Sequence, residues 1–222
     1  MSIETYLPFW QKLTPAQRET ISRTATTHRV QRGTVIHNGS EDCVGLLLIV
    51  SGQLRAFILS DEGKEITLYR LLSRDICLFS ASCMLNSIQF DISIEAEQDT
   101  TFYKIPTKVY HHLMQESAPV ANYTNELISA RFSDVMWLMD QILYKRLDSR
   151  LAAFLLEESA LTDTTELKIT HDAIARHLGS AREVVTRMLK YLQSEGAVTL
   201  SRGSITIADE KKLRGLAQES LR

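Results

Sequence analysis

The sequence predicts an α+β protein with a jelly-roll-like double-stranded β-roll at its N-terminus, a long helix, and a winged helix-turn-helix at its C-terminus. Short β-branched and aromatic runs fill residues 34–104, and a stretch of roughly 117–143 has proline only near its start. Two short helical patterns then flank Gly179 and lead into an alternating hairpin. We therefore divide the 222-residue chain into a β-roll domain (1–116), a long helix with its hinge (117–147) and a winged helix-turn-helix domain (148–222).

The composition is that of a globular protein, with 44% hydrophobic and 23% charged residues. A formal net charge of −2 means that any nucleic-acid footprint must be local. The N-terminal residues lack the pattern of a signal peptide, and no 18-residue uncharged apolar run follows, so we expect a cytoplasmic protein without a membrane segment. Cys43, Cys77 and Cys83 lack CxxC spacing, which favours structural thiols over a disulfide framework or a zinc site.

The β region is divided by turn signals at Asn38-Gly39, Ser51-Gly52 and Asp61-Glu62-Gly63. Its clearest strand is predicted over residues 91–101, where apolar and polar residues alternate with a period of two. The apolar positions are Ile92, Ile94 and Ala96, and the polar ones are Asp91, Ser93, Glu95 and Glu97. We expect the acidic side of this strand to be a solvated face.

The long helix carries a stripe of apolar residues at successive steps of four, three, four and three. Its members are Ile128, Phe132, Val135, Met139 and Ile142. This spacing predicts a parallel homodimer seam. The alternative is that these residues pack on their own β domain, and both can hold at once. Residues 144–146 are the expected hinge, and a new amphipathic helix is expected over 150–159.

Residues 170–192 have the pattern of a helix-turn-helix. Thr170 is placed to cap the first helix, and Gly179 permits the sharp turn. Ser180 is then expected to cap the second helix. Ile174, Ala175 and Leu178 form the inner face of the first helix.

The second helix separates its apolar residues from its polar ones. Val185, Met188, Leu189 and Leu192 recur at helical spacing and are expected to face the core. The opposite surface is left to Arg182, Glu183, Thr186 and Arg187, which we predict to read DNA bases. Arginine can form bidentate hydrogen bonds with guanine, and glutamate can accept from cytosine N4. The alternative is a capping box between Ser180 and Glu183 beside a solvated helix face.

An alternating hairpin over residues 198–207, with its turn near Arg202-Gly203, favours DNA reading because a helix-turn-helix followed by a hairpin is a winged helix. The expected phosphate partners are Thr170, His171, Ser180 and Arg202. His171 is disfavoured as a metal ligand because His177 lies on a different helical face. No metal site and no catalytic cluster is predicted, and we expect no enzyme activity.

At these residues the chain resembles the Crp/Fnr family of transcription regulators, over nearly its full length. Arg182, Glu183 and Arg187 fall where the catabolite activator of that family has its base-reading Arg, Glu and Arg, and Thr186 falls where Fnr-type members have a base-reading Ser. The resemblance implies a palindromic target with TGTGA-like or TTGAT-like half-sites about 34 Å apart, and RNA polymerase as a partner. Ala181 departs from the pattern, because the catabolite activator has a phosphate-contacting Ser there.

The sensory half departs further from the resemblance. Cyclic-nucleotide-binding members carry Gly-Glu and Arg-Ser pairs where this chain has Leu78-Phe79 and Phe90-Asp91. No Lys, Arg or His occurs from Asp75 through Tyr103, so the sequence offers no local positive charge for a phosphate, which disfavours cyclic AMP.

Metal cofactors of the family also match poorly. Three cysteines, none before Cys43, are too few for the four-cysteine iron–sulfur cluster of oxygen-sensing members. Haem is disfavoured because no histidine lies between residues 38 and 110, although Cys77, Cys83 and Met84 are possible soft ligands. We therefore predict no cofactor.

The effector pocket is expected at Cys77, Leu78, Phe79, Cys83, Met84 and Phe90. These residues suit an apolar or aromatic small molecule, whereas Cys77 and Cys83 could form a thiol switch or be buried and inert. We expect a DNA-binding regulator that responds to an unidentified small-molecule or redox signal. The alternative is a β-roll adaptor that regulates a protein partner, and replacing Arg182 and Arg187 by Ala separates the two hypotheses.

Overall fold

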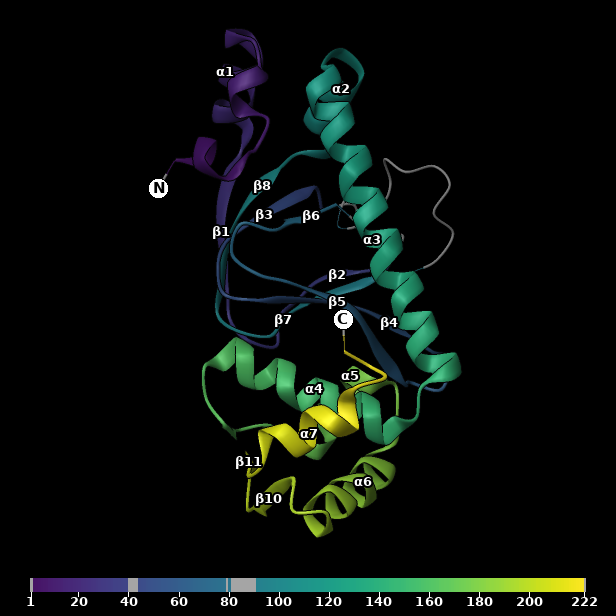
Figure 1. Cartoon of the computed structure of the whole chain (residues 1–222). Coiled ribbons are helices and arrows are strands. Elements are labelled where there is room, and N and C mark those ends of the chain that lie inside the picture. The colour runs from purple at the N-terminus through teal and green to yellow at the C-terminus, as the bar shows by residue number, and fades with distance from the viewer. Residues whose placement is uncertain (1, 40–43, 79, 81–90, 222) are drawn as a thin grey trace. The chain divides into compact units, whose positions relative to one another are not determined.

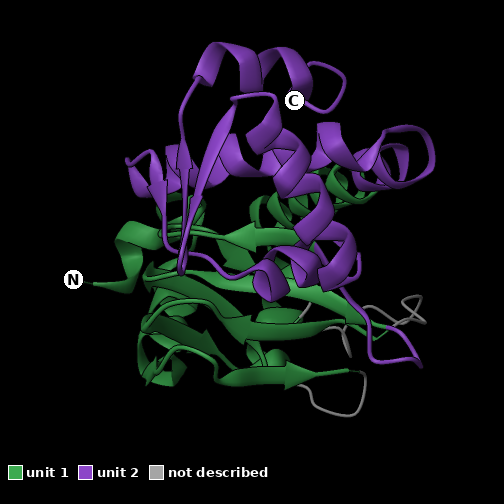
Figure 2. Cartoon of the chain, turned by 90° about the horizontal axis from the view of Figure 1, so that it is seen from below, with its two compact units in different colours: residues 1–59, 68–135 green, residues 60–67, 136–222 purple. Residues whose placement is uncertain are grey.

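The structure is a computed structural model that describes residues 2–39, 44–78, 80 and 91–221. Figure 1 labels its helices and strands in chain order. The chain divides into two compact units, shown in separate colours in Figure 2: residues 1–59 with 68–135, and residues 60–67 with 136–222. Although α3 has 27 residues, neither it nor any other helix in the described part of the chain has an apolar stretch that could cross a membrane.

The first unit begins with helical segments that the sequence analysis did not predict. The 3-10 helices η1 (Ile3–Tyr6) and η2 (Trp10–Lys12) precede α1 (Pro15–Thr24). Thr14 and Gln17 form a capping box at the start of α1, with Pro15 as its first residue. The T-P-A-Q sequence at this point is therefore a signal that would have identified the helix.

Two four-stranded sheets make up the β-roll. The strands are β1 (Thr26–Val30), β2 (Val35–Asn38), β3 (Leu46–Ser51), β4 (Leu54–Leu59), β5 (Glu65–Leu71), β6 (Ile76–Cys77), β7 (Ser93–Ala96) and β8 (Thr100–Ile105). One sheet has the order β1-β8-β3-β6 and the other β2-β7-β4-β5. β8 runs antiparallel to β1 and β3, and β7 runs antiparallel to β2 and β4.

The alternation of side chains along β3 places its residues in two cores, so this strand is buried on both faces of the first sheet. Leu47 and Ile49 belong to the apolar core that also contains Leu54 of β4 and Ile94 of β7. Leu46 and Leu48 belong to a second core with the N-terminal helical segments and the helices that follow the roll. The predicted fold class, with a jelly-roll-like β domain, a long helix and a helix-turn-helix, is confirmed.

The prediction of one strand over residues 91–101 is wrong. β7 ends at Ala96 and β8 begins at Thr100, and the two strands lie in different sheets. The Thr100 hydroxyl oxygen accepts from the Gln53 backbone N–H at 3.1 Å, which joins the start of β8 to the residue before β4. An alternating pattern cannot report such a change of sheet, because both strands keep apolar residues toward the same core.

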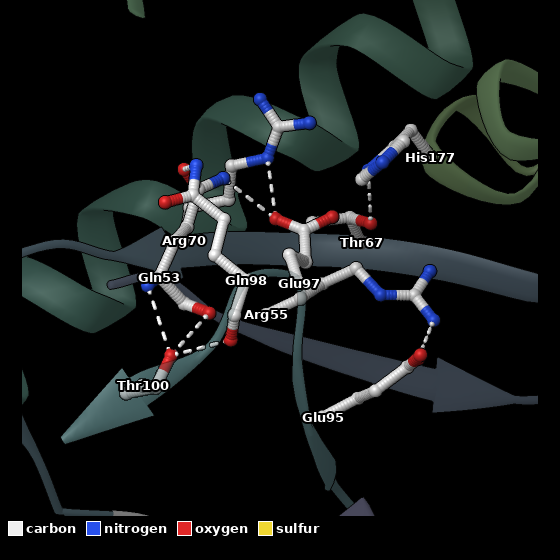
Figure 3. Close-up of polar contacts among 9 residues, drawn as sticks. All are labelled: Gln53, Arg55, Thr67, Arg70, Glu95, Glu97, Gln98, Thr100 and His177. Carbon is white, nitrogen blue, oxygen red and sulfur yellow. Dashed lines mark hydrogen bonds and ion pairs between the residues drawn. The ribbon is translucent and has the colours of Figure 1, made fainter. Parts of the chain in front are cut away.

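The acidic side of β7 is not a freely solvated face either. Glu95 accepts from Arg55 at 2.7 Å, and Arg55 lies on β4 with its side chain 3% exposed. Glu97 is paired with Arg70 of β5 at 3.1 Å and accepts from the Gln53 amide at 2.7 Å (Figure 3). These partners come from residues about 25 to 45 positions earlier, so no local pattern could reveal them. Burial of a charge requires such a partner.

Two helices follow the β-roll: α2 (Thr107–Glu116) and α3 (Ala118–Tyr144). The start of α3 is joined to α2 by a buried hydrogen bond of 2.7 Å between Tyr110 and Thr124. Because the Thr124 hydroxyl donates to the Val120 carbonyl, Tyr110 is the donor. Burial raises the pKa of Tyr110 to about 12, which keeps its proton in place.

The apolar stripe of α3 divides along its length. Phe132 is 67% exposed, and Met139 and Ile142 are each 46% exposed. Ile128 is half-buried and packs against the core of the first unit, so the alternative reading of the stripe applies to this residue. Val135 is also half-buried.

The second unit contains α4 (Leu147–Thr162), β9 (Glu166–Leu167), α5 (His171–Leu178), α6 (Arg182–Ser194), β10 (Val198–Ser201), β11 (Ser204–Ile207) and α7 (Glu210–Ala217). Its strands have the order β10-β11-β9. The helix predicted over 150–159 is longer at both ends in the structure, where α4 begins at Leu147 and ends at Thr162. The sequence analysis did not predict α7, which packs Leu213 and Ala217 into the core of the unit and is capped by Asp209.

Candidate nucleic-acid interface

The first helix of the helix-turn-helix begins as the sequence predicts. The Thr170 hydroxyl accepts from the Ala173 backbone N–H at 3.1 Å, so Thr170 caps α5. At the other end Gly179 adopts φ +64°, a left-handed conformation that costs glycine little. Arg150 of α4 donates to the Leu178 carbonyl at 2.7 Å and so satisfies one of the last carbonyls of α5.

The predicted cap of the second helix is wrong. α6 begins at Arg182, its N-cap residue is Ala181, and no side chain caps it. Ser180 lies one residue before the N-cap position of α6. Its backbone N–H bonds to the Ala175 carbonyl and so belongs to the end of α5. Glu183 is therefore the second residue of α6 and does not form a capping box with Ser180. Its carboxylate, in the first turn of α6, still interacts favourably with the helix dipole.

The two faces of α6 are separated as predicted. Val185, Leu189 and Leu192 are fully buried in the core of the second unit, and Met188 packs partly against it. Arg182, Glu183 and Arg187 are exposed. Within the part of the chain that the structure describes, none of these three forms an ion pair. Their charges are therefore available to a partner outside the chain.

Thr186 is the half-buried member of the predicted reading set. Its hydroxyl lies 2.9 Å from Nδ1 of His171, the first residue of α5, and 2.8 Å from the Arg182 carbonyl. The sequence analysis assigned the two side chains to different roles, bases and phosphate. It offered no signal for their contact, because they lie 15 positions apart on different helices.

Burial lowers the pKa of His171, and the nearby charge of Arg182 lowers it further. His171 is therefore neutral in the folded protein at neutral pH. Since its pKa is lower in the folded than in the unfolded chain, its contribution to stability is present above its ordinary value of 6.5 and is lost as the pH falls below it.

The hairpin after α6 forms the wing. Ser201 pairs with Ser204, so the loop consists of Arg202 and Gly203, and Gly203 has φ +82°. β11 also pairs with β9, which ties the wing to the residues before α5. Arg202 is exposed at the tip, as the predicted hairpin turn requires.

The predicted effector pocket is only partly described by the structure. Cys77 lies on β6 and is fully buried, and Leu78 is 2% exposed. The other predicted members, Phe79, Cys83, Met84 and Phe90, lie outside the described residues, as does Cys43.

Tertiary structure brings to this region a cation from outside residues 75–103. Arg131 of α3 lies over the ring of Tyr69 on β5, with its guanidinium carbon 4.4 Å from the ring centroid. Tyr69 is buried, and burial raises the pKa of its phenol well above its ordinary value. Arg131 is already paired with Asp134 at 3.0 Å. The β-roll core thus has the positive charge of Arg131 nearby, and Asp134 of the same helix neutralises that charge.

No set of three or more His, Cys, Asp or Glu residues among residues 2–39, 44–78, 80 and 91–221 is arranged to hold a metal ion. Of the three cysteines, the structure describes Cys77. Its thiol is buried and is not in a disulfide.

The chain is similar to known proteins in both of its parts. The cyclic nucleotide-binding domain family matches residues 27–117, and the Crp-like helix-turn-helix domain family matches residues 149–216. A crystal structure of a transcriptional regulator of the Crp/Fnr family from Eubacterium rectale is 60% identical, with a TM-score of 0.94, and the match covers 96% of this chain and 99% of that one.

Two more distant matches also cover most of the chain. The global nitrogen regulator of Synechococcus elongatus is 25% identical over 186 residues, which are 80% of this chain and 83% of that protein. A Crp/Fnr-family regulator from Thermus thermophilus shares the fold, with 24% identity, a TM-score of 0.70 and coverage of 87% of this chain and 98% of that one.

The missing cap of α6 predicts a stabilising substitution. Ala181→Ser supplies a hydroxyl at the N-cap, and we expect it to raise the free energy of unfolding by about 1 kcal/mol. Chemical denaturation followed by circular dichroism measures the change. Ser180→Ala is the matched control, because the Ser180 side chain caps neither helix, and we expect a change within about 0.5 kcal/mol. A larger loss for Ser180→Ala than gain for Ala181→Ser would contradict this cap assignment.

The charge of Arg182 predicts a shift in the titration of His171. Arg182→Ala removes the nearby positive charge, so the pKa of His171 should rise while burial still holds it below 6.5. The measurement is an NMR titration of the His171 ring protons. Arg187→Ala removes one arginine of the same helix and should leave the midpoint unchanged. An unchanged midpoint in Arg182→Ala would show that burial alone lowers the pKa.

Proposed function

Because the chain belongs to the Crp/Fnr family of transcription regulators, we propose that it binds palindromic promoter DNA as a homodimer, with an affinity set by a signal in its β-roll. The helix-turn-helix is the DNA-binding part. In this proposal the protein is a regulator and not an enzyme, RNA polymerase is its protein partner, and it acts in the cytoplasm, where bacterial chromosomal DNA lies.

The observation that carries the proposal is the exposed outer face of α6. Its apolar face is buried, so the helix can enter a major groove with its N-terminal half forward. Arg182 and Arg187 can each form two hydrogen bonds with guanine O6 and N7, and Glu183 can accept from cytosine N4. None of these side chains has to break an ion pair within the described residues before it binds a base.

Thr170, Ser180 and Arg202 are proposed to contact phosphates and so to set the register of the protein on DNA. His171, the fourth residue predicted for this role, is kept neutral by burial and by Arg182, so it lacks the positive charge that favours a phosphate. Thr170 uses its oxygen as an acceptor for the α5 cap, which leaves its hydrogen free for a phosphate. Arg202 extends from a two-residue wing, so its reach is set by the hairpin and not by a flexible loop.

The homodimer is proposed to form along α3. Phe132, Met139 and Ile142 are large, apolar and exposed along one helical stripe, which is unfavourable in water unless a second helix covers it. Val135 completes this seam, whereas Ile128 contributes at its edge because it also packs on its own core. Two recognition helices related by a twofold axis would meet half-sites about 34 Å apart.

The signal is proposed to be a small molecule or a redox change other than cyclic AMP binding. Of the relatives, one is named a cyclic AMP receptor protein and another a global nitrogen regulator, so the relatives are not all named for cyclic AMP. Here residues 75–103 contain no cation for a phosphate, and Arg131 is already paired with Asp134. An apolar ligand near Cys77 and Leu78, or oxidation of Cys77 and Cys83, is compatible with these residues.

Selection from random duplexes tests the proposal. The purified full-length protein, with and without cell extract, should enrich a palindrome at moderate salt. Arg182→Ala and Arg187→Ala should each weaken binding to that palindrome by at least about 1 to 3 kcal/mol and relax specificity at one position of each half-site.

Arg23→Ala is the matched control, because Arg23 is an exposed arginine on α1 and its removal changes the net charge equally. It should leave the affinity for the palindrome unchanged. Enrichment of no duplex under any of these conditions would refute the proposal. The adaptor alternative would be supported if the wild-type protein selects no DNA sequence and the two arginine variants still bind the same protein partner as the wild type.

The seam predicts the oligomeric state. Phe132→Glu and Met139→Glu place like charges opposite each other in an apolar interface, which costs several kcal/mol, so the dimer should weaken at least about tenfold. Light scattering measures the mass, and binding to the full palindrome should fall while binding to an isolated half-site persists. Ala130→Glu lies off the stripe and should remain dimeric. A monomeric wild-type protein would contradict the proposed seam.

A further inference from the structure

The contact between α5 and α6 determines which hydrogen-bonding groups Thr186 can offer to DNA. Its hydroxyl oxygen lies 2.8 Å from the Arg182 carbonyl and 2.9 Å from Nδ1 of His171. A carbonyl oxygen can only accept, so the single hydroxyl hydrogen of Thr186 is donated to Arg182. The bond to His171 must therefore run the other way, with the imidazole N–H donating to the Thr186 oxygen.

This direction also determines the form of His171. The proton of the neutral ring is on Nδ1, and Nε2 carries a lone pair. A neutral imidazole in this form presents an acceptor and not a donor from its outer nitrogen, and a phosphate needs a donor. The ring is kept neutral at neutral pH by burial and by the charge of Arg182, which lower its pKa. Asp172, the adjacent carboxylate on α5, is directed to Arg176 at 3.7 Å.

Thr186 consequently has no hydrogen left for a base. To donate to thymine O4 or guanine O6, it would have to give up its bond to the Arg182 carbonyl. One of the two lone pairs of its oxygen accepts from His171, and its methyl group takes part in no hydrogen bond. Apolar contact with the 5-methyl group of thymine is an established way of reading that base in the major groove.

We propose that Thr186 reads a thymine through its methyl group, and that His171 is the positioning residue that holds Thr186 in this orientation. This inference rests on the proposed function, since it assumes that α6 enters the major groove. It assigns His171 a role different from the phosphate contact that the sequence predicts. It also makes the specificity of one base pair depend on a hydrogen bond between the two helices.

Replacing thymines by deoxyuridine tests the methyl contact, because this change removes only the 5-methyl group. Each thymine of the selected half-site is replaced in turn, and the Kd of the full-length protein is measured by fluorescence anisotropy. One position should lose about fourfold in affinity per substituted half-site, the loss expected for one buried methyl group. All other positions should respond less.

Two variants of Thr186 separate the methyl group from the hydroxyl. Thr186→Val replaces the hydroxyl by a second methyl group, so a methyl group can face the base whether or not His171 holds the side chain. This variant should retain the preference for thymine over deoxyuridine at that position. Thr186→Ser keeps the hydroxyl and removes the methyl group, so its thymine-to-deoxyuridine ratio should fall to about one. The reverse result, a preference kept by Ser and lost by Val, would overturn the inference in favour of hydrogen-bond reading.

Two variants of His171 test its positioning role. His171→Ala removes the donor to Thr186 and should reduce the thymine preference. His171→Asn places an amide N–H near the position of Nδ1 and should restore much of it. Neither variant should change the dependence of affinity on salt. If His171 acts through a phosphate, both variants would weaken binding to all duplexes and reduce the salt slope by about one.

The free protein supplies a check that does not require DNA. Nitrogen NMR of the His171 ring above its titration range should show the proton on Nδ1, and a proton on Nε2 would overturn the inference. Selection of no palindrome at all would refute the proposed function and this inference together. A palindrome that is bound specifically but responds to no deoxyuridine substitution would overturn this inference alone.

Discussion

Burial of Val185, Leu189 and Leu192 in the core of the winged helix sets the rotation of α6 about its own axis. Each buried side chain of this size contributes about 1.5 to 3 kcal/mol, whereas an exposed charged side chain gains about 1 kcal/mol or less from a surface contact. The apolar face therefore decides the orientation, and the polar face follows from it. Arg182, Glu183 and Arg187 are presented together because none of them can enter the core, and the wing and α5 are arranged around the same buried face.

The sensory side depends on a comparable constraint. β3 is buried on both faces of the sheet β1-β8-β3-β6, and the hydrogen bond between Tyr110 and Thr124 joins α2 to the start of α3. The long helix thus leaves the β-roll in a set direction. Arg131, which lies over Tyr69 near Cys77, is adjacent in sequence to Phe132 of the proposed seam. Arg131 and Phe132 lie on one turn of α3, so a change at Tyr69 would have a short physical route to the proposed seam.

Charged side chains show how strongly context determines a role. Glu95 and Glu97 have the same alternation as a solvated strand face, yet each is held by an arginine that folding brings from another strand. Arg182 and Arg187 have the spacing of a solvated helix face, and they remain without ion pairs in the described structure. The charges of Glu95 and Glu97 are thus used in contacts within the fold, whereas those of Arg182 and Arg187 are available to a partner. His171 and Thr186 belong to neither class, because each is engaged by the other and only part of each side chain remains for DNA.

The sequence by itself determined the fold class, the length of α3, the cap at Thr170, the turn at Gly179 and the outward face of α6. These features follow from periodicity, capping and turn chemistry, which act over a few residues. Only the tertiary structure decided that residues 91–101 form two strands in different sheets, that Ala181 and not Ser180 precedes α6, and that Arg131 lies over Tyr69. It also decided the contact of His171 with Thr186. These outcomes depend on which distant segments pack together. Burial and hydrogen bonding between elements select that packing, and neither can be predicted from the local order of residues.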